Sequence, residues 1–168
     1  MNTSFSIRAF LGLALLAFVS SGCLKSDDNN NNACPYTDSP IVASSAEVTA
    51  LQNFITNAGL TATAHPSGLF YNITDPGTGS VATVCNRVTV RYSGRLTSGA
   101  VFDSNLTGIL FTLGQLIVGW QKGIPLIRPG GKITLYVPPS LGYGAAGAPP
   151  TIPGNAYLIF DIDLVAVQ

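Results

Sequence analysis

Apolar residues recur at every second position in two stretches of the chain, 88–92 and 158–164. A period of two places these side chains on one face of a β-strand. In the second stretch Phe160 shares a face with three aliphatic residues, whereas Asp161 and Asp163 lie on the other face. The pattern predicts an antiparallel sheet with one buried and one solvated face.

Shorter runs of apolar and β-branched residues predict further strands over 69–73, 111–113 and 133–137. The segment 96–102 is typical of a hairpin, with its turn at Ser98-Gly99. The residues between this hairpin and the strand at 111–113 are expected to form a loop.

A helix is predicted over 45–58, before these strands. Ser44 and Glu47 have the spacing of a capping box, in which each side chain satisfies a backbone N–H of the other residue. Apolar residues then fall on one helical face, and Gly59 fits the position after the helix. This face could pack on its own domain or form a dimer. We expect packing within the chain, and a monomer.

A second, shorter helix is predicted over 119–126, beginning near Trp120. Pro125 lacks an N–H and clashes with the carbonyl four residues earlier, which limits the helix. One helix lying across one face of a curled sheet gives an α+β fold. A pocket would form between Trp120 and the strand residues that face it.

The segment 137–153 joins two predicted strands and is uncharged and rich in Gly, Pro and Ala. Prolines fix φ and glycines permit positive φ, so such a loop can hold a defined shape. Tyr143 offers a hydroxyl and Ile152 an apolar side chain, which suits a dry pocket with one hydrogen-bond donor. A purely structural loop is the alternative interpretation.

Charge excludes some classes of partner. The 168-residue chain has 8 basic and 8 acidic residues, and the basic ones form no stripe, so we expect no nucleic-acid partner. One histidine and two cysteines supply too few ligands for zinc. The lone His65 lies beside Pro66 in a polar turn and is interpreted as a solvated loop residue.

The N-terminal segment 1–22 has the layout of a cleaved signal peptide. Arg8 precedes an apolar run, Phe10–Val19, which is shorter than the ~20 residues that a bilayer span needs. Cys23 follows Ser-Ser-Gly, which resembles a bacterial lipobox, although Ser20 replaces the usual leucine. We expect a lipid anchor on Cys23; a secreted form with a free thiol is the alternative.

Residues 23–40 are expected to form the lipidated start and a disordered tether, because the run 25–32 contains no apolar residue that could join a core. An N-terminal helical segment, 41–66, and a β domain, 67–168, would follow. Cys34 and Cys85 form a disulfide in our interpretation, since exported proteins meet an oxidising compartment; two unlinked thiols are the alternative.

Five motifs resemble, in order and spacing, those of FKBP-type peptidyl-prolyl cis-trans isomerases. They are V-R-Y-S-G-R-L at 90–96, G-A-V-F-D-S at 99–104, L-I-V-G-W at 116–120, L-G-Y-G at 141–144 followed by I-P at 152–153, and L-I-F-D-I at 158–162. The resemblance covers the chain from Leu69 to its end. It implies an FKBP-like antiparallel sheet curled around one short helix, with the N-terminal helix as an addition.

The resemblance also implies a proline-binding pocket, with Trp120 as its floor. The implied walls are Tyr92, Phe102, Leu116, Ile117, Ile152 and Phe160. The N–H of Ile117 and the hydroxyl of Tyr143 would hold peptide carbonyls, and Asp103 would lie at the edge near Tyr92. Ile109 departs from the family pattern, because it stands where an aromatic wall is common. No cofactor or metal is implied.

The implied function is isomerisation of X–Pro bonds, by desolvating and twisting the amide in an apolar aromatic pocket. Proline-containing polypeptides would be the partners, and folding of exported proteins the role. With a lipid on Cys23, we expect an outer membrane lipoprotein of a bacterial cell envelope, facing the periplasm or the surface. The alternative is a non-catalytic chaperone or surface polypeptide-binding lipoprotein with the same fold.

Overall fold

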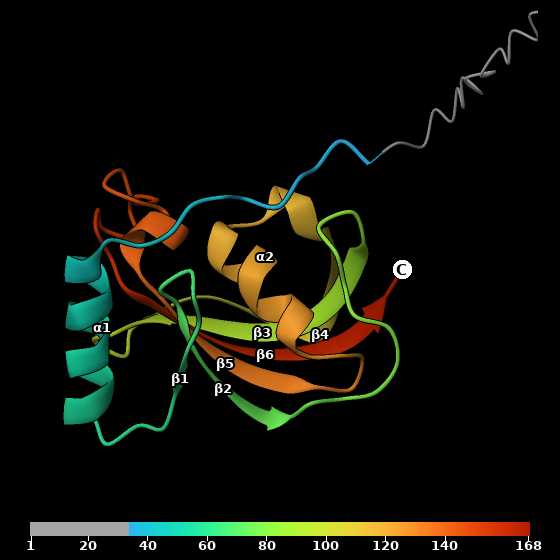
Figure 1. Ribbon diagram of the computed structural model, residues 1–168, viewed down its shortest axis with the longest axis horizontal. Helices are drawn as coiled ribbons and strands as arrows, with labels where there is room; N and C mark the ends of the chain where they lie inside the picture. The colour runs from blue at the N-terminus through green and yellow to red at the C-terminus, as the bar shows by residue number, and fades with distance from the viewer. Residues whose placement is uncertain (1–33) are drawn as a thin grey trace, which may run out of the picture. The chain divides into compact units, whose positions relative to one another are not determined.

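The computed structural model describes residues 34–168, which form one compact unit (Figure 1). Its helices and strands are α1 (Ser45–Asn57), β1 (Thr63–Ala64), β2 (Phe70–Asp75), β3 (Arg87–Leu96), β4 (Val101–Thr112), α2 (Val118–Gly123), β5 (Lys132–Val137) and β6 (Leu158–Val167). Three short 3-10 helices are η1 (Leu113–Gln115), η2 (Ile124–Leu126) and η3 (Pro139–Leu141). The expected helical segment 41–66 and β domain 67–168 both lie within this unit.

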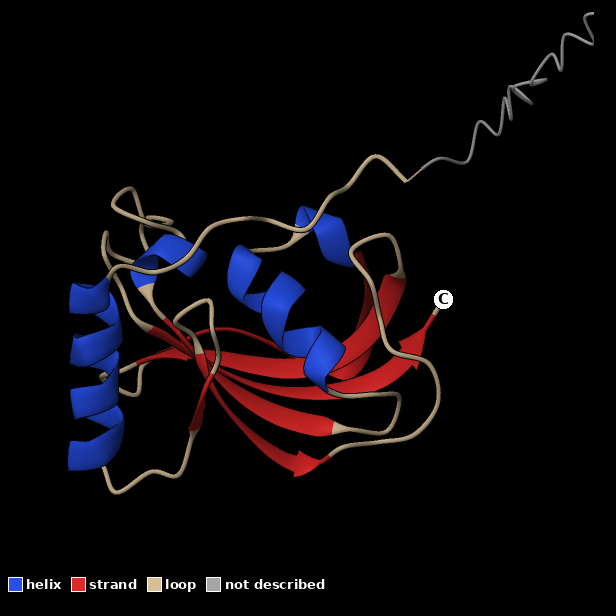
Figure 2. Ribbon diagram, in the orientation of Figure 1, coloured by secondary structure: helices blue, strands red, loops and turns tan. Residues whose placement is uncertain are grey.

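All strand pairs are antiparallel, in the order β1-β2-β5-β6-β3-β4. The sheet curls around α2, whose axis crosses the strands beneath it (Figures 1 and 2). The predicted α+β fold, an antiparallel sheet curled around one short helix, is confirmed.

The two faces of β6 follow the alternation in its sequence. Phe160 is buried in the core beneath α2, whereas Asp161 is exposed on the outer face. There Asp161 forms an ion pair with Arg95, and the Nζ of Lys132 lies 2.7 Å from Oδ2 of Asp163. Exposed pairs of this kind contribute about 0–1 kcal/mol each, so their main effect is to keep this face solvated.

Two glycines let α2 approach β5 closely. A Cβ on Gly119 would lie 2.6 Å from Cγ1 of Val137, and a Cβ on Gly123 would lie 2.5 Å from both Cδ atoms of Leu135. Both strand residues are fully buried. The backbone of the helix therefore lies directly on the side chains of Val137 and Leu135, which fixes the depth of Trp120.

The helix α1 covers the opposite face of the sheet at one end (Figure 1). Ser44 and Glu47 form the predicted capping box, and Gly59 has a φ of 65° just beyond the C-cap. Leu51 and Ile55 are buried against residues of β2, β5 and β6. The apolar face of α1 therefore packs within the chain.

The prediction of a loop between Phe102 and Phe111 is wrong, because β4 runs without a break through this segment. The strand accommodates a bulge opposite Val90 and Tyr92. Within the bulge, the Asn105 side chain accepts a hydrogen bond from the N–H of Gly108 at 2.9 Å. An Asx turn followed by a glycine can be absorbed as a bulge, whereas the sequence alone suggested a loop.

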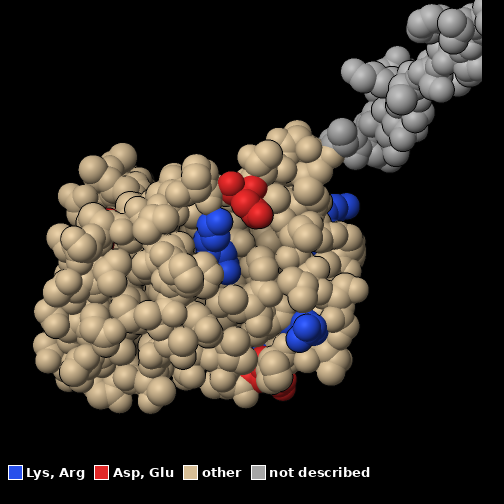
Figure 3. Space-filling model, in the orientation of Figure 1, with Lys and Arg blue, Asp and Glu red and all other residues tan. Residues whose placement is uncertain are grey.

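Charged side chains are sparse on the face shown in Figure 3 and do not gather into a large patch of one sign. Between residues 34 and 168, no helix is both long enough and apolar enough to span a bilayer. The expected signal peptide and the lipidated Cys23 lie outside the described residues.

Candidate active site

Trp120 lies at the centre of a cluster of aromatic rings. Its side chain is only 4% exposed. The rings of Tyr92, Phe111 and Phe160 lie 5.2, 6.2 and 5.3 Å from it, at interplanar angles of 84°, 83° and 88°. Edge-to-face rings at these distances attract one another, because the positive edge of one ring meets the negative face of the next.

Phe102 extends this cluster, with its ring 5.6 Å from that of Phe160. Both rings lie over the backbone of β3 at Gly94. A Cβ at this position would lie 2.7 Å from Cζ of Phe102 and 2.9 Å from Cε1 of Phe160. Any side chain at Gly94 would therefore displace these two rings. The role of this glycine was not predicted, although it lies in the middle of the first motif.

The aromatic cluster borders a cavity of about 200 Å³. Its lining residues are Tyr92, Phe102, Asp103, Phe111, Leu116, Ile117, Trp120, Tyr143 and Phe160. Pockets for drug-sized ligands are typically about 300–1,000 Å³. A cavity of this smaller size suits one side chain and its adjacent peptide bonds rather than a large ligand.

Polar groups meet at the rim of the cavity. The hydroxyl of Tyr92 donates a hydrogen bond to Oδ2 of Asp103 at 2.5 Å. Burial raises the pKa of Tyr92, and the hydrogen bond and negative charge of Asp103 raise it further. Burial and the charge of Asp103 likewise raise the pKa of Tyr143, whose side chain is 40% exposed. Both phenols therefore keep their protons at neutral pH and remain donors.

Ile117 is the N-cap of α2, and its carbonyl accepts hydrogen bonds from the N–H groups of Trp120 and Gln121. The first N–H groups of a helix have no partner within it, which leaves the N–H of Ile117 free of intrahelical bonds. The side chain of Gln121 donates to the carbonyl of Leu116 at 2.8 Å. The side-chain amide of Gln121, whose role was not predicted, thus fixes the backbone immediately before Ile117.

Eight of the nine residues proposed for the pocket line this cavity; Ile152 does not. Ile152 is 4% exposed and belongs to the main core. It pairs with Ala148 in a small β-bridge, with N···O distances of 2.8 and 3.0 Å. The bridge shapes the loop around Ile152, which is buried in the same core cluster as Trp120 and Phe160.

Phe111 lines the cavity but was not predicted to do so. Ile109 was noted as standing where an aromatic wall is common in the family. Phe111 lies two residues farther along the same strand, and therefore on the same face. Its ring lies 6.3 Å from that of Tyr92. Alternation along β4 was the signal that could have identified it.

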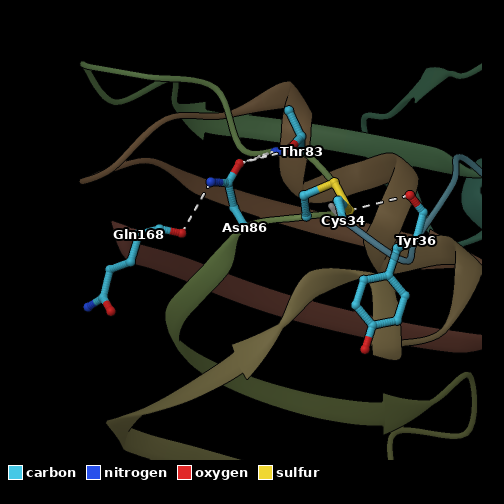
Figure 4. Close-up of a disulfide and its surroundings, with 6 residues drawn as sticks. Cys34, Tyr36, Thr83, Asn86 and Gln168 are labelled. Carbon is cyan, nitrogen blue, oxygen red and sulfur yellow. Dashed lines mark hydrogen bonds between the residues drawn. A yellow bond between two sulfur atoms is a disulfide. The ribbon is translucent and has the colours of Figure 1, made fainter. Parts of the chain in front are cut away.

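Cys34 and Cys85 form a disulfide, with their Cα atoms 5.5 Å apart (Figure 4). Cys85 lies in a short turn, where Oδ1 of Asn86 accepts from the N–H of Thr83 at 2.8 Å. The Asn86 amide also donates to the carbonyl of Gln168 at 3.1 Å (Figure 4). The bridge thus joins the first described residue to the beginning of β3 and the end of β6.

Metal-ligating side chains do not gather in groups of three anywhere between residues 34 and 168. His65 lies away from the cavity lining, in contact with Ser67, whose Oγ is 2.8 Å from its Nδ1. Burial lowers the pKa of His65, and the charge of Lys122 lowers it further.

The sequence between residues 79 and 165 matches the family model described as FKBP-type peptidyl-prolyl cis-trans isomerase. The chain belongs to this FKBP family. The match includes every residue of the cavity lining, and the helix α1 lies outside it.

Relatives from several bacteria carry similar FKBP sequences. The chain is 42% identical over 105 residues to a probable FKBP-type peptidyl-prolyl cis-trans isomerase of Haemophilus influenzae, covering 61% of this chain and 44% of that protein. It is 41% identical over 105 residues to the peptidyl-prolyl cis-trans isomerase Mip of Coxiella burnetii, covering 61% and 46%. The matched segment therefore spans less than half of each relative.

Solved FKBP structures have the same fold. The crystal structure of FkpA from Escherichia coli superposes with a TM-score of 0.65 at 35% identity, covering 73% of this chain and 58% of that one. A peptidyl-prolyl cis-trans isomerase from Pseudomonas syringae also has a TM-score of 0.65, at 32% identity, and the match covers 79% of this chain and 98% of that one.

Proposed function

We propose that this chain is a peptidyl-prolyl cis-trans isomerase that acts on proline-containing polypeptides. The observation that carries the proposal is the cavity of about 200 Å³, which has Trp120 and other aromatic rings as its lining and the hydroxyl of Tyr143 at its rim. A proline ring fits such a space and makes apolar contacts there. The peptide bond that precedes it then lies beside the donors.

The barrier to X–Pro rotation is about 18–20 kcal/mol and originates in amide resonance, so the uncatalysed change takes tens to hundreds of seconds. The planar amide is charge-separated, whereas the twisted amide has lost the double-bond character of its C–N bond. A water-poor pocket disfavours the planar form relative to the twisted one. Lowering the barrier by about 6 kcal/mol accelerates rotation about ten-thousandfold.

Each residue has a role in this mechanism. Trp120 and Phe160 exclude water from the prolyl ring, and the N–H of Ile117 holds one carbonyl of the peptide. The Tyr143 hydroxyl, which is protonated at neutral pH, donates to a second carbonyl. Tyr92 fixes the orientation of Asp103 at the edge of the cavity through their hydrogen bond. No covalent bond of the substrate breaks.

The test is a protease-coupled assay of the full chain on a tetrapeptide with one X–Pro bond. Trp120 is the only tryptophan in the sequence, so its fluorescence reports peptide binding in the same sample. We expect binding to change the fluorescence and isomerisation to accelerate in proportion to protein concentration. Binding without acceleration would instead support a non-catalytic polypeptide-binding module.

We also propose that Cys23 carries a lipid that tethers the enzyme in a bacterial cell envelope, where it assists folding of exported proteins. The signal-like segment 1–22 and the lipobox-like residues before Cys23 support this proposal. The wild-type chain is expected to partition into detergent, and Cys23→Ala into the aqueous phase. Equal partitioning of the two would overturn the lipid anchor and leave the isomerase proposal unaffected.

A further inference from the structure

The position of Tyr143 depends on how its loop begins. We name residues 138–157, between β5 and β6, the Tyr143 loop. It opens with the 3-10 helix η3, and the N–H of Gly144 then donates back to the carbonyl of Pro139 at 2.9 Å. The N–H of Gly147 donates to the carbonyl of Tyr143 at 3.1 Å. Because these bonds tie the turn around Tyr143 to η3, displacing η3 displaces the Tyr143 hydroxyl.

The carboxylate of Glu47 binds η3 from the N-terminal helix. Its Oε1 accepts a hydrogen bond from the N–H of Ser140 at 2.9 Å, and its Oε2 accepts from the Ser140 hydroxyl at 2.9 Å. The same Oε2 accepts from the N–H of Ser44 at 2.9 Å, which closes the capping box of α1. One side chain therefore caps a helix and holds a loop 93 residues away in sequence.

Glu47 is ionised in this setting. Burial by itself would raise the pKa of Glu47, but the hydrogen bonds from Ser44 and Ser140 outweigh it and lower the pKa below its ordinary value. A carboxylate that accepts charge-assisted hydrogen bonds holds its partners more strongly than a neutral acceptor would. Tyr157 is the titratable group near it, and burial and then the charge of Glu47 raise the pKa of that phenol.

The far end of the Tyr143 loop packs against the core cluster that α1 shares with β2, β5 and β6. Tyr157, the last loop residue, packs against the cluster that contains Leu51 and Ile55. The start of the loop is therefore held by α1 through a double hydrogen bond, and its end packs against the cluster to which α1 contributes. This helix lies outside the segment, 79–165, that matches the family model.

We propose that Glu47 is a positioning residue for isomerisation, which fixes the Tyr143 loop so that the Tyr143 hydroxyl can donate to a bound peptide carbonyl. The inference rests on the proposed function of the cavity. Glu47 touches η3 and not the cavity lining, so it acts through Tyr143.

The test compares four single substitutions in the full chain. Glu47→Ala removes the loop contact and the carboxylate half of the capping box, whereas Ser140→Ala removes the hydroxyl contact and leaves the capping box intact. Ser44→Ala is the matched control, because it weakens the cap of α1 and leaves both Ser140 bonds in place. Glu47→Gln retains acceptor oxygen and is expected to restore part of what Glu47→Ala loses.

The first readout is kinetic. Losing one typical hydrogen bond corresponds to a loss of up to about tenfold in kcat/KM, and we expect a loss of this order for Glu47→Ala and for Tyr143→Phe. Because Glu47 acts through Tyr143, the variant that combines Glu47→Ala with Tyr143→Phe should lose little more kcat/KM than either single variant. Ser44→Ala should keep wild-type kinetics. Fully additive losses, or an equal loss in Ser44→Ala, would overturn the proposal.

The second readout does not depend on activity. Hydrogen exchange at the N–H groups of Gly144 and Gly147 should accelerate at least threefold in Glu47→Ala and to a smaller extent in Ser140→Ala, and stay unchanged in Ser44→Ala. If the wild-type chain has no isomerase activity but this pattern appears, the cavity function fails and the loop contact stands. Unchanged exchange at both glycines in Glu47→Ala would overturn the positioning role whatever the activity.

Discussion

At the scale of single residues, the cavity depends on rings that come from different elements. Trp120 comes from α2, and the three rings around it come from β3, β4 and β6. Each ring is held by the packing of its own element, so the ligand need not order them on binding. A preformed site of this kind saves the free energy of immobilising side chains on association.

The first prediction concerns Phe160, whose ring contacts both Trp120 and Phe102. In Phe160→Leu the buried volume is largely kept, but the aromatic wall beside the prolyl ring is lost. We expect kcat/KM for an X–Pro tetrapeptide to fall at least about tenfold, equivalent to about 1.4 kcal/mol. Val165→Ala, at an exposed position of the same strand, is the control and should retain wild-type activity.

Most of the residues around the cavity were predictable, because the family motifs carry them at fixed spacing. Phe111 and Ile152 are the two residues for which motif spacing and the cavity lining differ. Motif spacing assigned Ile152 to the wall, whereas the cavity lining does not include it and a short β-bridge pairs it with Ala148. Phe111 lies outside the motifs, and only its place on β4 brings it to Trp120. Contacts made by loop geometry or by strand pairing are not encoded in local spacing.

At the scale of elements, local chemistry predicted α1 well, because the Ser44–Glu47 capping box and Gly59 define its ends. It predicted β4 poorly. The Asn105 turn and Gly108 are loop-like in isolation, yet pairing with β3 on either side absorbs them into one strand. Ser140, the second partner of Glu47, could not be found from sequence, because nothing local relates residues so far apart.

The second prediction concerns the seat of α2 on the sheet. Replacing a helical glycine with alanine ordinarily stabilises a protein by about 1 kcal/mol. In Gly119→Ala the new Cβ would meet Val137, which is fully buried and stiff at χ1. Overpacking typically costs about 1–3 kcal/mol, so we expect a net loss of stability and a displaced Trp120.

Urea unfolding followed by Trp120 fluorescence measures both effects of Gly119→Ala. The exposed substitution Asn53→Ala on α1 is the control, and it should leave stability unchanged or raise it slightly. If the free energy of unfolding of Gly119→Ala equals or exceeds that of the wild type, α2 does not lie as close to the sheet as described.

At the scale of the whole molecule, folding brings phenols from separate elements into a setting that disfavours their charged form. Burial raises the pKa values of Tyr92, Tyr136 and Tyr143. A group whose pKa is higher in the folded state binds its proton more tightly there. The folded protein is therefore more sensitive to alkaline pH than its few charged residues would suggest.

The third prediction is the sign of this pH dependence. Below about pH 10, the ordinary tyrosine pKa, Tyr92 is protonated in both states and adds no slope. Above it the unfolded chain loses the proton first, so the free energy of unfolding falls as pH rises toward the folded pKa. Unfolding of wild type and Tyr92→Phe should show a shallower alkaline decline in the variant. Parallel declines would contradict the assignment.

The fourth prediction concerns the disulfide, which closes a loop with a sequence separation of 51 residues. In the chain-entropy model a loop of this size contributes up to about 4 kcal/mol, and measured values are typically about 2–4 kcal/mol. Cys34→Ser should lower the free energy of unfolding by this amount. Adding a reductant to the wild type should have the same effect, and adding it to the variant should change nothing.

The Cys34–Cys85 bridge also determines where mechanical tension would enter the domain. A pull on the chain before Cys34 passes through the bridge to the beginning of β3, and bypasses residues 35–84 between the two cysteines. Residues 35–44 and the helix α1, which carries Glu47, lie inside this span and bear no load while the bridge is intact. If Cys23 carries the proposed lipid, tension between the membrane and a bound polypeptide would reach β3 without pulling α1 away from the sheet.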